Sequence, residues 1–193
     1  WTDWERDIAL RQGDAVSRWT ERLRDEVDYH AFLQFLFNRQ WSALRAYTEE
    51  RGVRIIGDIP LFMGHDSADV WAHQPLFRLD HAGQPKVVAG VPPDYFSATG
   101  QRWGNPHYNW QRMAENGYEW WMNRLRRVLW QVHIVRLDHF RGFAGFWEVP
   151  ASAETAVEGR WVKGPGAEFF LRAGDALGEL PIIAEDLGLI TED

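Results

Sequence analysis

One short apolar segment ends in charged residues that could do chemistry together. In HIVRLDHFRG, side chains alternate between the two sides of a strand, so Ile134, Arg136 and Asp138 share one face. A guanidinium beside a carboxylate stabilises its ionised form, which suits a residue that attacks as an anion at neutral pH. A structural ion pair explains the same spacing, but charges at the end of an apolar strand are costly unless they are paired or functional. The pattern favours Asp138 as a nucleophile beside Arg136.

A second candidate acid lies in PIIAEDLG. Alternation puts Ile183 and Glu185 on one side and Ala184 and Asp186 on the other, so only one acid follows the inward face, and we predict Glu185. A neighbouring carboxylate and a bound substrate favour the protonated form of an acid, as a proton donor requires. Asp186 is more simply explained as a helix N-cap. Two carboxyl groups about 5 to 5.5 Å apart on neighbouring strands would suit a retaining displacement.

Three segments each combine a predicted helix with a short apolar strand that ends at an acid. The helix and strand ranges are 16–50 with 53–56, 118–131 with 133–137, and 167–180 with 182–184. Alternating helices and apolar strands imply a parallel sheet, and such folds place their chemistry at the carboxyl ends of the strands. We therefore predict an α/β fold with Asp58, Asp138 and Glu185 on one edge of the sheet.

Aromatic residues are abundant, with 12 Trp, 5 Tyr and 11 Phe. Those at helical spacing in the first helix are interpreted as core, not as a site; this stripe comprises Tyr29, Phe32, Leu33, Leu36, Phe37, Leu44 and Tyr47. Others fall in the interval 61–116, whose Gly, Pro, Asp and His content predicts a long functional loop or a small subdomain over a site. Flat rings with polar neighbours suit a pyranose, although most single Trp residues are expected in the core.

The overall composition excludes several classes of protein. The chain is 45% hydrophobic and 25% charged, as in soluble globular proteins, and its formal net charge of -7 argues against binding to nucleic acid. It has no cysteine, which excludes disulfides and thiolate metal sites. We find no apolar stretch typical of a membrane span and no signal peptide in the opening residues, so we expect a cytoplasmic protein without a membrane partner.

Four histidines in the irregular interval match no zinc motif in their spacing; they are His65, His73, His81 and His107. Lone histidines in loops are more often surface or hydrogen-bonding residues. We therefore predict no metal and no cofactor.

Four segments, in this order, resemble the amylomaltases, or 4-α-glucanotransferases, of glycoside hydrolase family 77: GDIPLFMGHDSADVW, VAGVPPDYFSATGQRWGNPHYNW, VRLDHFRGFAGFWEVP and IIAEDLG. The resemblance covers residues 51–190, and residues 1–50 are less diagnostic. It implies a partial TIM-type (β/α)8 barrel, with 61–116 inserted over the active site of a single domain that spans residues 1–193. It also implies that the partners are maltooligosaccharides and α-1,4-glucans.

The resemblance assigns a role to each acid. Asp138 would form a covalent glucosyl-enzyme, Glu185 would protonate the leaving oxygen and later deprotonate the acceptor, and Arg136 would keep Asp138 ionised. Asp58 matches an aspartate expected to contact the donor glucose, although an Asp before Pro60 is also typical of a turn.

The segment PPDYFSATGQRWGNP resembles the family's loop over the active-site groove. Tyr95 and Phe96 would contact the glucan, whereas Trp103 and Asn105 either contact it or shape the loop. An apolar lid of this kind suits a transferase, because an acceptor hydroxyl must react before water does. His139 is left out of the site, since strand alternation points it away from Asp138.

One family feature is missing. The third essential acid of the family, on a His-Asp motif after a later strand, would lie beyond Asp193, and roughly 250 residues are typical of a complete barrel. We therefore expect a piece of a longer protein that is inactive alone. The sequence leaves open an α-glucan hydrolase of the α-amylase clan, which would use the same carboxylates, and a non-catalytic glucan-binding module.

Overall fold

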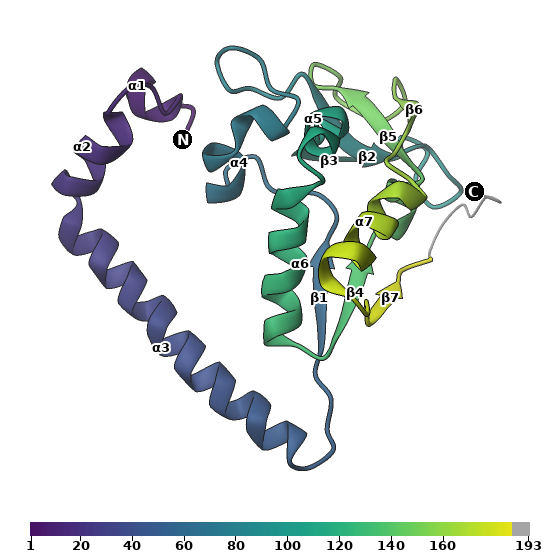
Figure 1. The fold of residues 1–193 in the computed structure, drawn as a ribbon. Coiled ribbons are helices and arrows are strands. Elements are labelled where there is room, and N and C mark those ends of the chain that lie inside the picture. Colours follow the sequence, from purple (N-terminus) through teal and green to yellow (C-terminus); the bar gives the residue numbers. More distant parts are fainter. Residues whose placement is uncertain (187–193) are drawn as a thin grey trace.

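A three-stranded parallel sheet lies at the centre of the structure. The computed structural model describes residues 1–186, and its parallel strands are β1 (Ile56–Pro60), β4 (Ile134–Asp138) and β7 (Ile182–Ala184), in the order β1-β4-β7. The helices α6 (Glu119–Gln131) and α7 (Ala167–Leu177) lie beside these strands (Figure 1). The predicted α/β character and the predicted parallel pairing are therefore confirmed.

The bounds of the first two parallel strands differ from the predicted ranges, by one residue for β4 and by more for β1. The first strand begins at Ile56, where the predicted strand ended, and runs to Pro60. Its pairing sets Asp58 opposite Arg136 and Pro60 opposite Asp138. Asp58 therefore lies inside the strand, two residues before its end, because backbone pairing with β4 extends the strand past the apolar run.

The helices agree with the predicted ranges more closely than the strands do. The first range becomes α2 (Ala15–Arg22) and α3 (Arg24–Glu49), preceded by the short α1 (Arg6–Ala9). α6 begins one residue later than predicted, and α7 ends three residues earlier, at Leu177. Over residues 1–186, none of the helices combines the length and apolar character needed to cross a lipid bilayer.

The apolar stripe of α3 is not core in the described part of the chain. The helix has no buried residue, and Phe32 and Tyr47 are each 54% exposed. α3 extends away from both sheets (Figure 1), and its second half is joined to the end of α6 by a hydrogen bond from Trp41 Nε1 to the Gln131 carbonyl at 2.7 Å. Our prediction of a buried stripe is wrong here, because within residues 1–186 little packs over this face.

The interval 61–116 contributes two strands to a second, antiparallel sheet. Its four strands have the order β3-β2-β5-β6 and are β2 (Val87–Val91), β3 (Gln101–Pro106), β5 (Gly145–Pro150) and β6 (Arg160–Lys163). The interval also contains the short helices α4 (Ala68–Ala72) and α5 (Trp110–Glu115) and the 3-10 turn η1 (Gln74–Leu76). A second 3-10 turn, η2 (Phe140–Phe143), follows β4. A buried Glu148 on β5 pairs with Arg78 and, at 2.7 Å, with Arg160, so its charge is compensated inside the sheet.

The core joins the two sheets. Val135 and Leu137 of β4 are fully buried on one face of the strand, and they belong to the same apolar cluster as Trp121 of α6 and Phe146 of β5. Because buried residues alternate along β4, Arg136 and Asp138 share its other, partly exposed face, and the sequence predicts this sharing.

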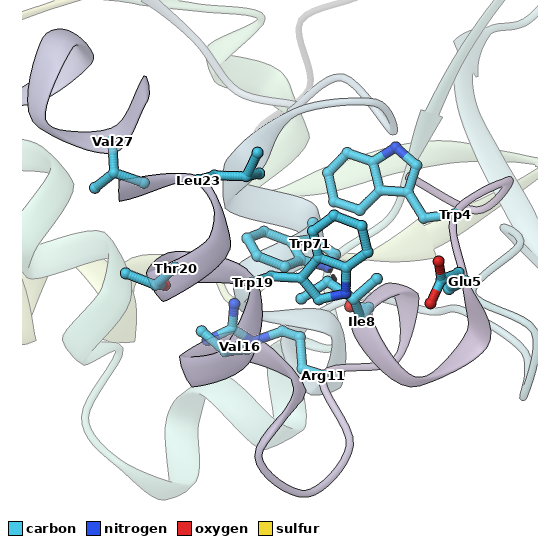
Figure 2. Close-up of a pocket in the computed structure, with 10 residues that line it drawn as sticks. All are labelled: Trp4, Glu5, Ile8, Arg11, Val16, Trp19, Thr20, Leu23, Val27 and Trp71. Atoms are coloured by element: carbon cyan, nitrogen blue, oxygen red, sulfur yellow. Dashed lines mark hydrogen bonds between the residues drawn. The ribbon is translucent and has the colours of Figure 1, made fainter. Parts of the chain in front are cut away.

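A separate apolar pocket of about 600 Å³ lies at the N-terminal helices (Figure 2). Trp4 and Trp71 meet edge to face there, with ring centroids 5.5 Å apart, and the Arg11 guanidinium lies 4.5 Å from the Trp71 ring centroid. None of the predicted site residues lines this pocket, so it is distinct from the carboxylate edge of the parallel sheet.

Candidate active site

The predicted carboxylates are tied together by one guanidinium. Arg136 Nη1 donates to both carboxylate oxygens of Asp58, at 2.9 and 2.7 Å, and Arg136 Nη2 donates to Asp138 Oδ1 at 3.0 Å. Parallel pairing explains the first contact, because Asp58 and Arg136 are direct partners on adjacent strands. Strand alternation explains the second contact, because residues two apart share a face. The hydrogen bond with Asp58 raises the pKa of Arg136, so the guanidinium stays cationic.

Asp138 and Glu185 line one hollow of about 460 Å³. The backbone N–H of Glu185 donates to the Leu137 carbonyl at 3.1 Å, which extends the pairing of β4 with β7 and sets Glu185 next to Asp138 in the sheet. Phe96, in the loop between β2 and β3, and Trp103, on β3, line the same hollow. The structure therefore brings four of the predicted site residues together, two acidic and two aromatic.

The loop that carries Phe96 is shaped by Asp94. Its carboxylate oxygen Oδ1 accepts hydrogen bonds from the backbone N–H groups of Phe96 and Ser97, at 2.9 and 2.8 Å. Gly100 closes the loop with a φ of +66°, and a Cβ there would lie 2.4 Å from the Val91 carbonyl oxygen, so a larger residue does not fit. This local turn holds Phe96 out toward the hollow with 80% of its surface exposed.

Besides Arg136, three predicted residues lie outside the lining of the hollow. Asp58 reaches it only through Arg136. Tyr95 is 89% exposed, and its ring centroid lies 4.0 Å from that of Phe96. Asn105 Nδ2 donates to the Met63 carbonyl at 3.0 Å, so this side chain shapes the loop. Contacts of these three residues with a glucan stay a prediction.

His139 lines the hollow, although strand alternation predicts that it points away from Asp138. The backbone turns into the left-handed region at His139, with a φ of 53°, so the two-residue period ends at Asp138. The ring meets Trp103 edge to face, with centroids 4.9 Å apart. Burial lowers the pKa of His139, while Glu185 and Asp138 act in the opposite direction.

Arg141 and Trp161 are among the lining residues of the hollow that were not predicted. Arg141 belongs to the 3-10 turn after β4. Trp161 lies on β6, outside the four segments that resemble the family. In the sequence, Trp161 lies between Arg160 and Val162 on a short strand, which gives no sign that it faces a site.

His107 is the one predicted loop histidine that is fully buried. Neither ring nitrogen has hydrogen-bond geometry with a described residue, although the backbone of Val88 and Trp147 lies close enough to offset part of the effect of burial. Burial lowers its pKa to about 4, so the ring is neutral. In residues 1–186, no three His, Asp or Glu side chains are grouped to hold a metal ion. Leu187 and Gly188 of the last motif, and the helix that Asp186 was predicted to cap, lie outside the described residues.

Carboxylates at the carboxyl edge of a parallel sheet, facing aromatic walls, are the arrangement of an α/β enzyme that acts on glycosides. The sequence model of the 4-alpha-glucanotransferase family, glycoside hydrolase family 77, matches residues 1–193, and the chain belongs to this family.

Named relatives agree with this membership. The chain is 53% identical to the 4-alpha-glucanotransferase of Thermus thermophilus over 193 residues and 51% identical to that of Synechocystis over 195 residues, covering 100% of this chain and 39% of each relative. An amylomaltase from Streptococcus agalactiae in complex with acarbose has a TM-score of 0.95 and 40% identity, over 99% of this chain and 39% of that chain. The chain thus spans about two fifths of the length of these proteins.

Proposed function

We propose that the protein to which these residues belong is a 4-α-glucanotransferase. It would transfer a segment of a 1,4-α-D-glucan to the 4-position of an acceptor glucose or glucan. The observation that carries this proposal is the bridge from Arg136 to Asp58 and Asp138, next to Glu185 in an aromatic-walled hollow. The family membership and the acarbose complex of the streptococcal amylomaltase support an α-glucan as substrate.

The first half of the reaction uses both acids of the hollow. A carboxylate oxygen of Asp138 attacks the anomeric carbon of the donor glucose, while the Glu185 proton moves to the leaving glycosidic oxygen. The bond from the anomeric carbon to that oxygen breaks, and a covalent glucosyl-enzyme remains. Arg136 donates to Asp138 before the attack and holds Asp58 beside it.

The second half reverses these roles. Glu185 removes the proton from the 4-hydroxyl of an acceptor, whose oxygen attacks the anomeric carbon and displaces Asp138. Two inversions at one carbon retain the α-configuration. Tyr95 and Phe96 would hold the acceptor and limit access of water to the intermediate, while Trp103 and Asn105 would either contact the glucan or shape the loop.

The fold proposal goes beyond the observed sheet. We infer that β1, β4 and β7 are consecutive parts of a (β/α)8 barrel within one catalytic domain that includes residues 1–193, with 61–116 as an insertion over its active edge. The cytoplasm remains the expected compartment.

The test uses the longest natural chain that contains these residues. It is incubated with maltotriose, and the products are separated by size over time. A ladder of longer maltooligosaccharides with released glucose is the expected result, and it should disappear in Asp138→Asn, with a loss on the order of 1,000-fold or more. Asp66→Asn, an acid outside the hollow, serves as the matched control.

Other product patterns would replace the proposal. Glucose and maltose alone would mean an α-glucan hydrolase. Binding of maltooligosaccharides by calorimetry without turnover, unchanged in Asp138→Asn, would mean a glucan-binding module.

A further inference from the structure

Trp161 is a large exposed aromatic residue on an outer strand of the antiparallel sheet. It is 41% exposed, and its ring forms part of the wall of the hollow that contains Asp138 and Glu185. An exposed ring in the wall of a hollow that also holds two carboxylates is accessible to a ligand that enters there. The position of Trp161 therefore asks for a functional explanation.

The Trp161 ring is held in place from two directions. Trp147, its cross-strand partner, meets it edge to face with centroids 5.5 Å apart, and Trp147 Nε1 is itself fixed to the Ala156 carbonyl at 2.8 Å. The Arg141 guanidinium lies 4.8 Å from the Trp161 ring centroid. A flat ring held rigidly beside a cationic fork with several N–H donors is prepared to bind a ligand at little cost in entropy.

The chemistry of this pair matches one kind of ligand. A pyranose presents C–H groups on its faces and hydroxyl groups on its rim, so it suits an aromatic ring next to hydrogen-bond donors. Trp103 comes from β3 and Trp161 from β6, which are the two outer strands of the same sheet. A linear glucan that crosses the hollow past Asp138 would therefore meet an aromatic residue on each side.

We propose that Trp161 and Arg141 form a glucose-binding subsite away from the reacting bond, which makes longer α-glucans better substrates than short ones. This inference rests on the proposed glucanotransferase function and names a part of the substrate site that neither the sequence motifs nor the carboxylate geometry assign. Trp161 contributes ring contact with the sugar, and Arg141 contributes the orientation of that ring.

The experiment separates remote binding from chemistry in the longest natural chain that contains these residues. Transfer is measured as kcat/KM with maltotriose and with maltoheptaose. The release of fluoride from α-glucosyl fluoride, which carries a single glucose, reports the chemistry at Asp138. In Trp161→Ala we expect kcat/KM for maltoheptaose to fall about tenfold, with a smaller fall for maltotriose and fluoride release within about twofold of the parent.

Trp130 supplies a matched control. It is also 41% exposed, and Arg127 lies 4.5 Å from its ring centroid, but it is on α6 and does not line the hollow. Trp130→Ala should leave all three measurements unchanged. Trp161→Phe keeps a flat ring and should retain most of the preference for maltoheptaose, whereas Trp161→Leu keeps apolar volume without a flat face and should lose it. The pair decides the question even if the alanine variant fails to fold.

The outcomes distinguish this inference from the function on which it rests. A parent enzyme that neither transfers glucan nor releases fluoride would remove the proposed function and the subsite with it. A parent that transfers, with Trp161→Ala or Trp161→Leu indistinguishable from Trp130→Ala, would overturn the subsite alone. An equal fall in fluoride release and in maltoheptaose transfer would also overturn it, because Trp161 would then support the chemistry instead of binding remote glucose.

Discussion

Arg136 holds Asp58 through two hydrogen bonds from a single nitrogen, at 2.9 and 2.7 Å, across two adjacent parallel strands. Its second terminal nitrogen reaches Asp138 at 3.0 Å. One cation therefore fixes the direction of two carboxylates, and it does so from a side chain that is only 34% exposed. The planar fork of arginine is what allows this division of contacts.

Arg136→Lys tests the geometry of this bridge. Lysine keeps the positive charge but cannot donate along two fixed directions, so Asp138 loses its orientation. We expect kcat for transfer to fall on the order of 100-fold with a small change in KM. Arg127→Lys, on the exposed face of α6, should behave as the parent does. Equal activity in the two variants would show that charge alone is sufficient at position 136.

Glu185→Gln tests the assignment of the proton donor. Transfer from maltotriose should fall on the order of 1,000-fold, because the leaving sugar oxygen needs a proton. Fluoride leaves without that help, so α-glucosyl fluoride should still form the covalent intermediate, detectable as a mass increase of one glucosyl group. If the fluoride donor fails as completely as maltotriose does, Glu185 has another role. Asp138→Asn should form no adduct with either donor.

Phe96→Ala tests the apolar lid. Phe96 is 80% exposed at the hollow, and its loss should let water reach the intermediate more often. We expect the ratio of hydrolysis to transfer to rise about tenfold while total turnover changes less. Phe35→Ala removes another exposed ring, from α3, and should leave the ratio as it is. A constant ratio in Phe96→Ala would exclude a role in guarding the intermediate.

His107 predicts a dependence of stability on pH. Its pKa is lowered to about 4 by burial, so the folded state binds its proton less readily than the unfolded state does. The folded state therefore keeps its full stability at pH values above the pKa of His107 in the unfolded chain. It loses stability as the pH falls from there toward the pKa of His107 in the folded protein. Between pH 7.5 and pH 5, His107 should lower the free energy of unfolding by roughly 2 kcal/mol.

Urea unfolding of the parent and of His107→Leu at these two pH values measures this effect. Between pH 7.5 and pH 5, the free energy of unfolding should fall by roughly 2 kcal/mol less in His107→Leu than in the parent, whatever the absolute stability of the variant. His81→Leu, at an exposed turn, serves as the control. If the free energy of unfolding changes equally with pH in His107→Leu and in the parent, then burial does not lower the pKa of His107.

The local part of the site follows from sequence. Alternation along one strand places Arg136 and Asp138 together, and the same rule selects Glu185 over Asp186 at the hollow. The hydrogen bond between Asp58 and Arg136 was not predicted, because it depends on the register of two strands 78 residues apart, which no local period specifies. His139 was misplaced because the period ends where the backbone turns into the left-handed region.

The helical pattern shows a different limit of sequence reasoning. The period of α3 was predicted correctly, yet its apolar residues are exposed in the described chain. A helical period tells which side chains share a face, but it does not tell what covers that face. The antiparallel sheet was not predicted either, because β2 pairs with β5, a strand that follows only after β4, with Val87 opposite Pro150.

The span between Asp58 and Arg136 also bears on how the protein folds. Two parallel strands pair only after a long stretch of chain has been closed into a loop, and the entropy lost in that closure is not repaid until the sheet forms. The bridge between these residues is therefore absent from any locally collapsed state. During refolding, the hydrogen bonds of Arg136 with the two carboxylates should form later than the helices. Helices form between residues that are near in sequence, whereas these carboxylates are placed only when distant strands pair.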